Sequence, residues 1–134
     1  MNLENARNEV VAGWGGTQAA KLCMRILDYI AEANFQELRM LTFRQLCNAS
    51  KLDAVNEDLI AALAILTSEK VDVLKSGALF VDIDETEYEL SSEELRQIQL
   101  YGTFIHPDTG EAVDEIEARV FPFFAPSDKL ALSL

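Results

Sequence analysis

The sequence has few cysteines for a disulfide framework, and it lacks the long apolar run of a membrane span and the residue order of a secretion signal. It has two cysteines, three prolines and six glycines among 134 residues, and no apolar run long enough to cross a bilayer, which takes about 20 residues. Its first residues carry Glu4 and Glu9 and lack the basic and then apolar order of a signal peptide. We therefore expect a cytoplasmic protein that makes no contact with a membrane.

Residues that bind metals or catalyse reactions are equally scarce. Cys23 and Cys47 form no CxxC pair and have no histidine nearby, so we expect no metal and no other cofactor. Their helix-like surroundings favour reduced core thiols, with a disulfide between them as the alternative. The single histidine, His106, precedes the tight-turn sequence 107–110. We expect it to hydrogen-bond this turn, because no activated serine or cysteine motif accompanies a dyad with Asp108.

Basic residues are outnumbered two to one. Eleven Lys and Arg residues stand against 23 Asp and Glu residues, which gives a net charge of −12. Residues 1–75 hold eight basic and ten acidic groups, whereas residues 76–134 hold three and 13. An acidic surface repels nucleic acid, so DNA is an unlikely partner. The second half of the chain is instead suited to a partner with a basic surface.

What the chain does contain is ordinary globular composition, with 49% apolar and 25% charged residues. We expect a polar N-terminal arm over residues 1–16 and a single domain over residues 17–134, with an acidic C-terminal extension from about residue 91. Apolar residues at steps of three and four predict a helix over 17–33. Two shorter helices follow, over 42–50 and about 57–68.

Residues 71–83 predict two strands joined by the loop Lys75-Ser76-Gly77. This loop places Val71, Val73, Leu79, Val81 and Ile83 on one buried face. Leu74, Phe80 and Asp82 then point outward, so the hairpin carries an apolar spot.

Three helices followed by a hairpin resemble the winged helix-turn-helix superfamily over about residues 17–84. The resemblance rests on the short Thr42–Ser50 helix, the longer Asn56–Ser68 helix and the hairpin directly after it. It implies a three-helix core with a β-hairpin wing. Members of the superfamily largely bind DNA through the third helix and a basic wing, and others only hold proteins together.

The third helix departs from the DNA-binding pattern. It opens with Glu57 and Asp58, continues with apolar residues only, and offers Asn56 as its one plausible base reader. A helix that is apolar all round is normally buried. We therefore expect its outer side to be covered by the C-terminal region, a second copy of the chain or another protein.

The C-terminal third begins with a capping box. Ser91 and Glu94 predict a helix over residues 92–101 that Gly102 ends. After it, residues 103–106 and 111–116 flank the turn as a small hairpin, or the second piece is a short helix. Pro122 restricts residues 120–124 to an edge strand or an extended segment. The phenylalanines of this segment either complete the core over the third helix or anchor a partner.

A second likeness concerns the strand end at Asp82. Asp82, Asp84 and Thr86 have the DxDxT spacing that opens the haloacid dehalogenase-like phosphatases. That resemblance implies Asp82 as the nucleophile, Asp84 as the acid/base and Mg²⁺ between them. Too few residues follow Thr86 for the later motifs and the doubly wound sheet of that family. We therefore expect solvated carboxylates at a strand end and no enzyme.

Together these observations predict an α+β fold, with a winged-helix-like core, a wing, a C-terminal helix and short strands. The expected function is that of a non-enzymatic interaction subunit or adaptor on a winged helix that has lost DNA binding. Its partner is a protein with a basic surface, or a second copy bound through the third helix. The expected partner-binding residues are Leu74, Phe80, Phe121, Phe123, Phe124, Asp82, Asp84, Glu85 and Glu87.

Two alternatives to the adaptor remain open. One is a dimeric transcription regulator that binds DNA, in which the basic residues of the first two helices touch phosphates; these are Arg25, Arg39, Arg44 and Lys51. The other is an acidic DNA mimic that occupies the DNA site of a nucleic-acid enzyme. The mimic requires the carboxylates of residues 82–117, rather than the aromatic residues, to carry binding.

Overall fold

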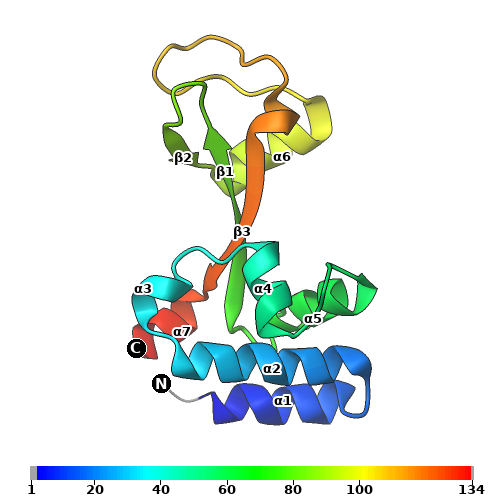
Figure 1. Cartoon of the computed structure of the whole chain (residues 1–134). Helices are drawn as coiled ribbons and strands as arrows, with labels where there is room; N and C mark the ends of the chain where they lie inside the picture. The colour runs from blue at the N-terminus through cyan, green and yellow to red at the C-terminus, as the bar shows by residue number, and fades with distance from the viewer. Residues whose placement is uncertain (1–2, 134) are drawn as a thin grey trace. The chain divides into compact units, whose positions relative to one another are not determined.

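Two separate clusters of buried apolar side chains organise the chain. The computed structural model describes residues 3–133, except for the side chains of residues 35, 92 and 131–133. Unit 1 comprises the described residues up to Ser76 and from Phe124 onward, and unit 2 comprises Gly77–Phe123. Within these residues the fold is α+β, with seven α-helices and one three-stranded antiparallel sheet (Figure 1). This division does not coincide with a single body over 17–134 or with a boundary near residue 91.

The three predicted helices of unit 1 are confirmed. They are α2 (Gln18–Glu32), α4 (Phe43–Ala49) and α5 (Glu57–Thr67). Their N-caps, Thr17, Thr42 and Asn56, each accept a hydrogen bond from a first-turn backbone amide. A capped first turn satisfies amide groups that have no partner inside the helix, so the sequence signal is local and dependable. Two short helices complete the set: α3 (Phe35–Leu38) and α7 (Asp128–Ser133).

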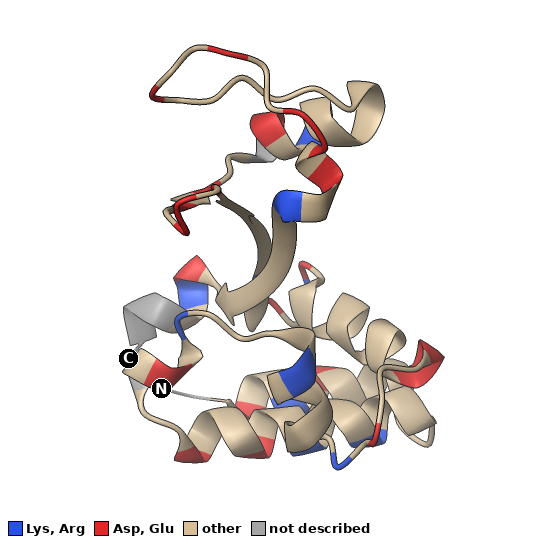
Figure 2. Ribbon diagram, turned by 45° about the horizontal axis from the view of Figure 1, so that its top comes forward, with Lys and Arg blue, Asp and Glu red and all other residues tan. Residues whose placement is uncertain are grey.

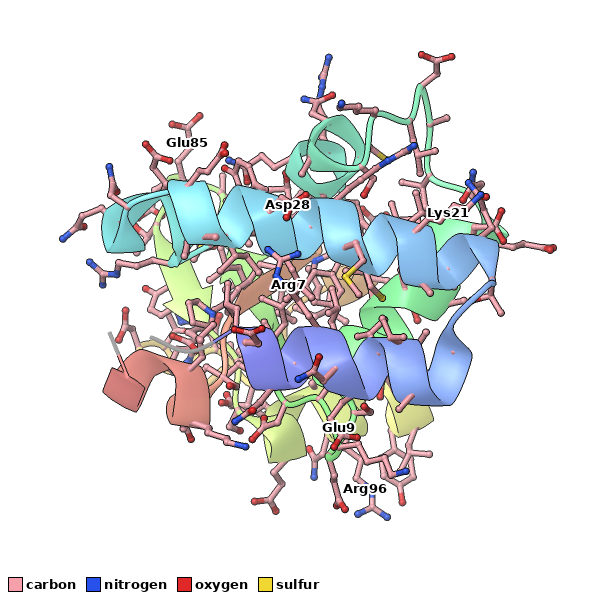
Figure 3. All side chains as sticks on the ribbon, turned by 90° about the horizontal axis from the view of Figure 1, so that it is seen from below. Arg7, Glu9, Lys21, Asp28, Glu85 and Arg96 are labelled. Atoms are coloured by element: carbon pink, nitrogen blue, oxygen red, sulfur yellow. The ribbon has the colours of Figure 1, made fainter. Side chains whose placement is uncertain are left out.

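The N-terminal arm was predicted wrongly. Residues Glu4–Trp14 form a helix, α1, which lies beside α2 (Figure 3). Ala6 and Val10 are buried along its inner side, Leu3 is buried directly before it, and the Arg7 guanidinium forms a 2.7 Å ion pair with Asp28 of α2. Few apolar residues form the buried side of this helix, and the polar residues between them obscured its helical periodicity in the sequence.

The predicted hairpin loop is also wrong. Strand β1 (Leu74–Val81) runs straight through Lys75-Ser76-Gly77, and the chain reverses only after Asp82. Strand β2 (Glu87–Glu89) pairs with β1 so that Phe80 faces Tyr88. Gly77 is needed for close packing rather than for a turn, because a Cβ there would stand 2.5 Å from the Phe123 ring.

This register reverses several predicted orientations. Leu74 is 2% exposed and Phe80 is fully buried, although both were expected to point outward. Ile83 was expected in the core and is 79% exposed. A shift of the turn along the chain moves side chains from one face of a strand to the other, which explains the reversal.

Strand β3 (Val120–Pro126) lies on the other side of β1, in the order β2-β1-β3. Its outer position in the sheet confirms the edge strand predicted from Pro122. In unit 1, Phe124 exchanges two 2.7 Å backbone hydrogen bonds with Leu41, and its ring packs edge-on against Phe43 of α4. The chain leaves unit 1 within β1 and returns within β3.

Unit 2 has its own small core. It consists of Ala78, Phe80, Leu90, Ile98, Phe104 and Ile116. Helix α6 (Ser92–Tyr101) begins at the predicted capping box of Ser91 and ends at Gly102, which has φ +67°. After α6, Ile105 pairs with Ala112 as a minimal hairpin, and a 3₁₀ turn follows over Ile116–Arg119.

Candidate functional site

The predicted partner-binding residues divide into buried and exposed groups. Four of the predicted side chains are buried and are not part of the surface: Leu74, Phe80, Phe123 and Phe124. Phe121 is 52% exposed, Asp82 is half-buried, and the carboxylates of Asp84, Glu85 and Glu87 are exposed. The exposed members all belong to unit 2, where four of them lie in or beside the turn 82–86.

Backbone and side-chain hydrogen bonds fix this turn. The Asp82 amide donates to the Thr86 carbonyl at 2.9 Å, and the Glu85 amide donates to the Asp82 carbonyl at 3.0 Å. The carboxylates of Asp82 and Asp84 accept the Ile83 and Thr86 amides at 2.8 and 3.0 Å. Hydrogen bonding by Thr86 holds the pKa of Asp84 below its usual value. The turn therefore presents Ile83 to solvent on a well-tethered backbone.

His106 fastens the turn 82–86 to the loop that follows it. Its Nδ1 accepts the backbone amides of Asp108 and Thr109 at 3.0 and 3.3 Å. A ring nitrogen that accepts two N–H groups carries no proton, so the proton of the neutral ring is on Nε2. Nε2 donates it to the Asp82 carboxylate at 2.6 Å. The turn contact predicted for His106 is confirmed, and its carboxylate partner is Asp82 rather than Asp108.

This arrangement leaves His106 without a free nitrogen lone pair. The ring is buried and both of its nitrogens are engaged within the protein. The His106 hydrogen bond is also the largest cause that lowers the pKa of Asp82, followed by the Ile83 amide. The pair therefore ties the turn 82–86 to the loop 106–110.

Tyr88 of β2 joins the same cluster. Its hydroxyl donates to Asp108 Oδ2 at 2.5 Å, and this hydrogen bond is the main reason that the pKa of Tyr88 is raised to about 12. The Tyr88 ring lies 5.7 Å from the Phe80 ring and 5.4 Å from the His106 ring. Aromatic packing and the two carboxylates thus hold β2, the turn and the 106–110 loop in one assembly.

Two shallow hollows flank Ile83, and we call them together the Ile83 groove. The first, of about 330 Å³, is lined by Asp82, Ile83, His106, Thr109, Glu111, Ala112, Val113, Asp114 and Arg119. The second, of about 390 Å³, is lined by Val81, Asp82, Ile83, Glu115, Ala118, Arg119 and Phe121. The groove thus combines exposed apolar side chains with carboxylates, and Arg119 is the only cation in its lining.

The charge of unit 2 surrounds this groove. Residues 77–123 hold 12 acidic and two basic groups, a net charge of −10, and the rest of the chain holds a net charge of −2. Figure 2 shows that the coloured positions of unit 2 are mostly red. Most of the net negative charge of the chain therefore lies in unit 2.

The outer face of α5 is another exposed apolar feature. Leu59, Leu63 and Leu66 are buried against unit 1, but Ile60 is 50% exposed. Ala61 and Ala64 share this open face, and Glu57 lies at its N-terminal end. This outer side was expected to be covered by the C-terminal region, a second copy of the chain or another protein. Within the described residues it is exposed, and cover by a second copy or another protein stays a prediction.

The two cysteines, the remaining candidate residues, are both buried. Burial raises the pKa of Cys23 to about 12, and its Sγ lies 3.4 Å from the Ala62 carbonyl oxygen. Cys23 and Cys47 are both free thiols. Across residues 3–133 no three His, Cys, Asp or Glu side chains are placed to hold a metal ion, and no helix is long and apolar enough to cross a membrane.

The comparisons with known proteins found no match among protein-family models, curated proteins or solved structures.

Sequence reasoning missed Ile83 and Arg119 as members of the site. Alternation along a strand assigned Ile83 to the core, although its position between Asp82 and Asp84 was an available signal. A lone isoleucine inside an acidic turn sequence is poorly explained by a buried strand. Arg119 gave no local signal, because its place beside Asp82 depends on how the chain folds back after α6.

Proposed function

We propose that the protein is a non-enzymatic interaction subunit, built on a winged-helix framework that no longer binds DNA, and that unit 2 contacts a protein partner. The framework comprises α2, α4 and α5 followed by antiparallel strands. In this proposal β1 and β3 are the wing strands, and Leu41 paired with Phe124 is the short strand that precedes α4. Residues of unit 2 then form the connection between these two strands in the sequence.

The exposed face of α5 supports the loss of DNA binding. A recognition helix reads bases with basic or amide side chains. Here the face consists of Glu57, Ile60, Ala61 and Ala64, so it presents a carboxylate and hydrocarbon to the phosphates. Among the basic residues that would touch phosphates, Arg25 is half-buried and donates to the Ser50 carbonyl at 2.8 Å.

The engaged state of His106 supports a role without catalysis. The proton-transfer residue that a hydrolase needs has to reach its substrate, and both ring nitrogens are already used. Asp82 is the nucleophile in the phosphatase resemblance. Here its two carboxylate oxygens accept hydrogen bonds from the Ile83 amide and from His106.

The single observation that carries the proposal is the exposure of Ile83 and Phe121 along one groove within the −10 unit. Large apolar side chains that are exposed to water along one groove are typical of interaction surfaces. The surrounding carboxylates add long-range attraction for a basic partner and select against acidic ones.

The test is affinity capture of the tagged protein from lysate of its native cell, with nuclease, followed by mass spectrometry. The wild type is compared with Ile83→Ser, Phe121→Ser and the control Leu100→Ser, which removes an exposed apolar side chain of unit 2 outside the groove. We expect a stoichiometric protein that the wild type and the control retain and both groove variants lose.

Other outcomes favour other functions. Capture of nuclease-sensitive DNA alone would favour the transcription regulator. A partner lost after carboxylate neutralisation but retained by both groove variants would favour the DNA mimic. Loss of self-association in Ile60→Ser, with no other partner captured, would favour a homodimer through α5.

A further inference from the structure

The lining of the Ile83 groove combines apolar and acidic side chains. Ile83 lines both hollows, and Phe121 lines the second. Three exposed residues of the lining carry carboxylates, Glu111, Asp114 and Glu115, and we call these the border carboxylates. Any occupant of the groove therefore meets both hydrocarbon and negative charge.

The border carboxylates are available for pairing. Asp82 is engaged by His106, and Arg119 is the nearby cation that contributes to its low pKa. The side chains of Glu111, Asp114 and Glu115 make no hydrogen bond or ion pair within the described part of the chain. They are solvated groups that bind a cation without first breaking an internal contact.

The size of the groove restricts the shape of the occupant. Hollows of about 330 and 390 Å³ are at the small end of the range for ligand pockets. Hollows of this size fit individual side chains. An extended segment suits two such hollows with Ile83 in common, because it can place one side chain in each.

We infer that the groove binds an extended protein segment in which lysine or arginine residues flank one large apolar anchor. This inference rests on the proposed function and names the chemistry of its partner. The anchor packs against Ile83 and Phe121, and the flanking cations pair with Glu111, Asp114 and Glu115. Because the hydrogen bonds of the turn already hold Ile83 in place, little conformational entropy is lost on that side when the anchor docks.

Synthetic peptides of defined composition test this inference with the full chain. The probes are Lys-Lys-Leu-Lys-Lys, Lys-Lys-Ser-Lys-Lys and Glu-Glu-Leu-Glu-Glu, each flanked by Gly-Ser, and binding is followed by amide chemical shifts in NMR titrations. We expect the first peptide to perturb residues 82–86 and 111–121 and to bind about tenfold more tightly than the second, with no binding of the third.

Variants of the protein test the two components separately. Ile83→Ser is expected to weaken the Lys-Lys-Leu-Lys-Lys peptide about tenfold, with Leu100→Ser as the unchanged control. Asp114→Asn is expected to weaken it a few-fold and to lower its salt dependence. Arg119→Gln is expected to tighten it a few-fold, because this change removes the repelling cation of the groove.

Three results would overturn the inference. These are equal binding of the leucine and serine peptides, shifts that map outside the groove, or an unchanged affinity in Ile83→Ser. The proposed function fails separately, when capture from lysate gives no partner that depends on Ile83 and Phe121. A captured partner that depends on both residues, with no binding of the basic leucine peptide, would leave the function standing and refute the segment chemistry.

Discussion

Replacing Phe80 by alanine tests whether unit 2 has a core of its own. The Phe80 ring is fully buried and lies 5.0 Å from the Phe104 ring, 5.7 Å from Tyr88 and 5.8 Å from His106. Truncating a buried phenylalanine costs about 3–5 kcal/mol of the free energy of unfolding. A single core in so small a unit rarely supplies more than about 3–5 kcal/mol. Phe80→Ala should therefore unfold unit 2 or leave it barely stable.

Amide hydrogen exchange measures this effect residue by residue. The Leu90 amide donates to Ala78 and the Val113 amide to Phe104, so both report on unit 2. The only tryptophan, Trp14 of α1, reports on unit 1 through its fluorescence. In Phe80→Ala we expect exchange protection at Leu90 and Val113 to be lost while the Trp14 unfolding transition persists.

A matched control separates loss of the core from loss of an aromatic ring. Phe121→Ala removes an exposed ring of the same unit and should leave protection at Leu90 within a few-fold of the wild type. Retained protection at Leu90 in Phe80→Ala would refute the buried position of Phe80. It would restore the outward orientation that the sequence pattern predicts.

Three further predictions concern charge and capping. The hydrogen bond to His106 is the chief cause that lowers the pKa of Asp82. The stability that this carboxylate contributes is therefore present above its unfolded pKa of about 3.9 and is lost as pH falls through its folded pKa. Acid unfolding of Asp82→Asn, followed by circular dichroism, should show a weaker pH dependence below about pH 4. The hydrogen bond to Asp108 is the chief cause that raises the pKa of Tyr88 to about 12. The stability that this tyrosine contributes should therefore decline as pH rises from about 10 towards 12. In Tyr88→Phe, this decline and the absorbance of the phenolate that forms near pH 12 should both disappear. Asn56→Ala removes the cap of α5 and should lower the free energy of unfolding by about 1 kcal/mol in urea titrations, and no change would show that the cap is dispensable.

The helices that the sequence predicted correctly carry local signals. Thr17, Thr42, Asn56 and Ser91 lie directly before the helices that they cap, and Gly102 ends α6 with a positive φ. A cap is a hydrogen bond across three residues, so neighbouring residues suffice to specify it. The same holds for His106, whose contact with the following turn is only two residues long.

The strands were harder because their partners are distant in sequence. Lys75-Ser76-Gly77 has the composition of a tight turn, yet β1 passes through it. Gly77 is accounted for by Phe123, which comes from a strand more than 40 residues later. No local pattern in the sequence indicates that Gly77 packs against the ring of a residue so distant in the chain.

The sequence by itself determined the composition of this protein's surfaces and most of its helices. The acidic second half, the uncharged body of α5 and the capped helix starts follow from residue identity and from contacts a few residues long. Tertiary structure alone decided which side chains meet solvent, since strand register depends on pairing across the chain. It buried Phe80 in the core of unit 2, and it exposed Ile83 and joined Asp82 to His106 in the lining of the groove.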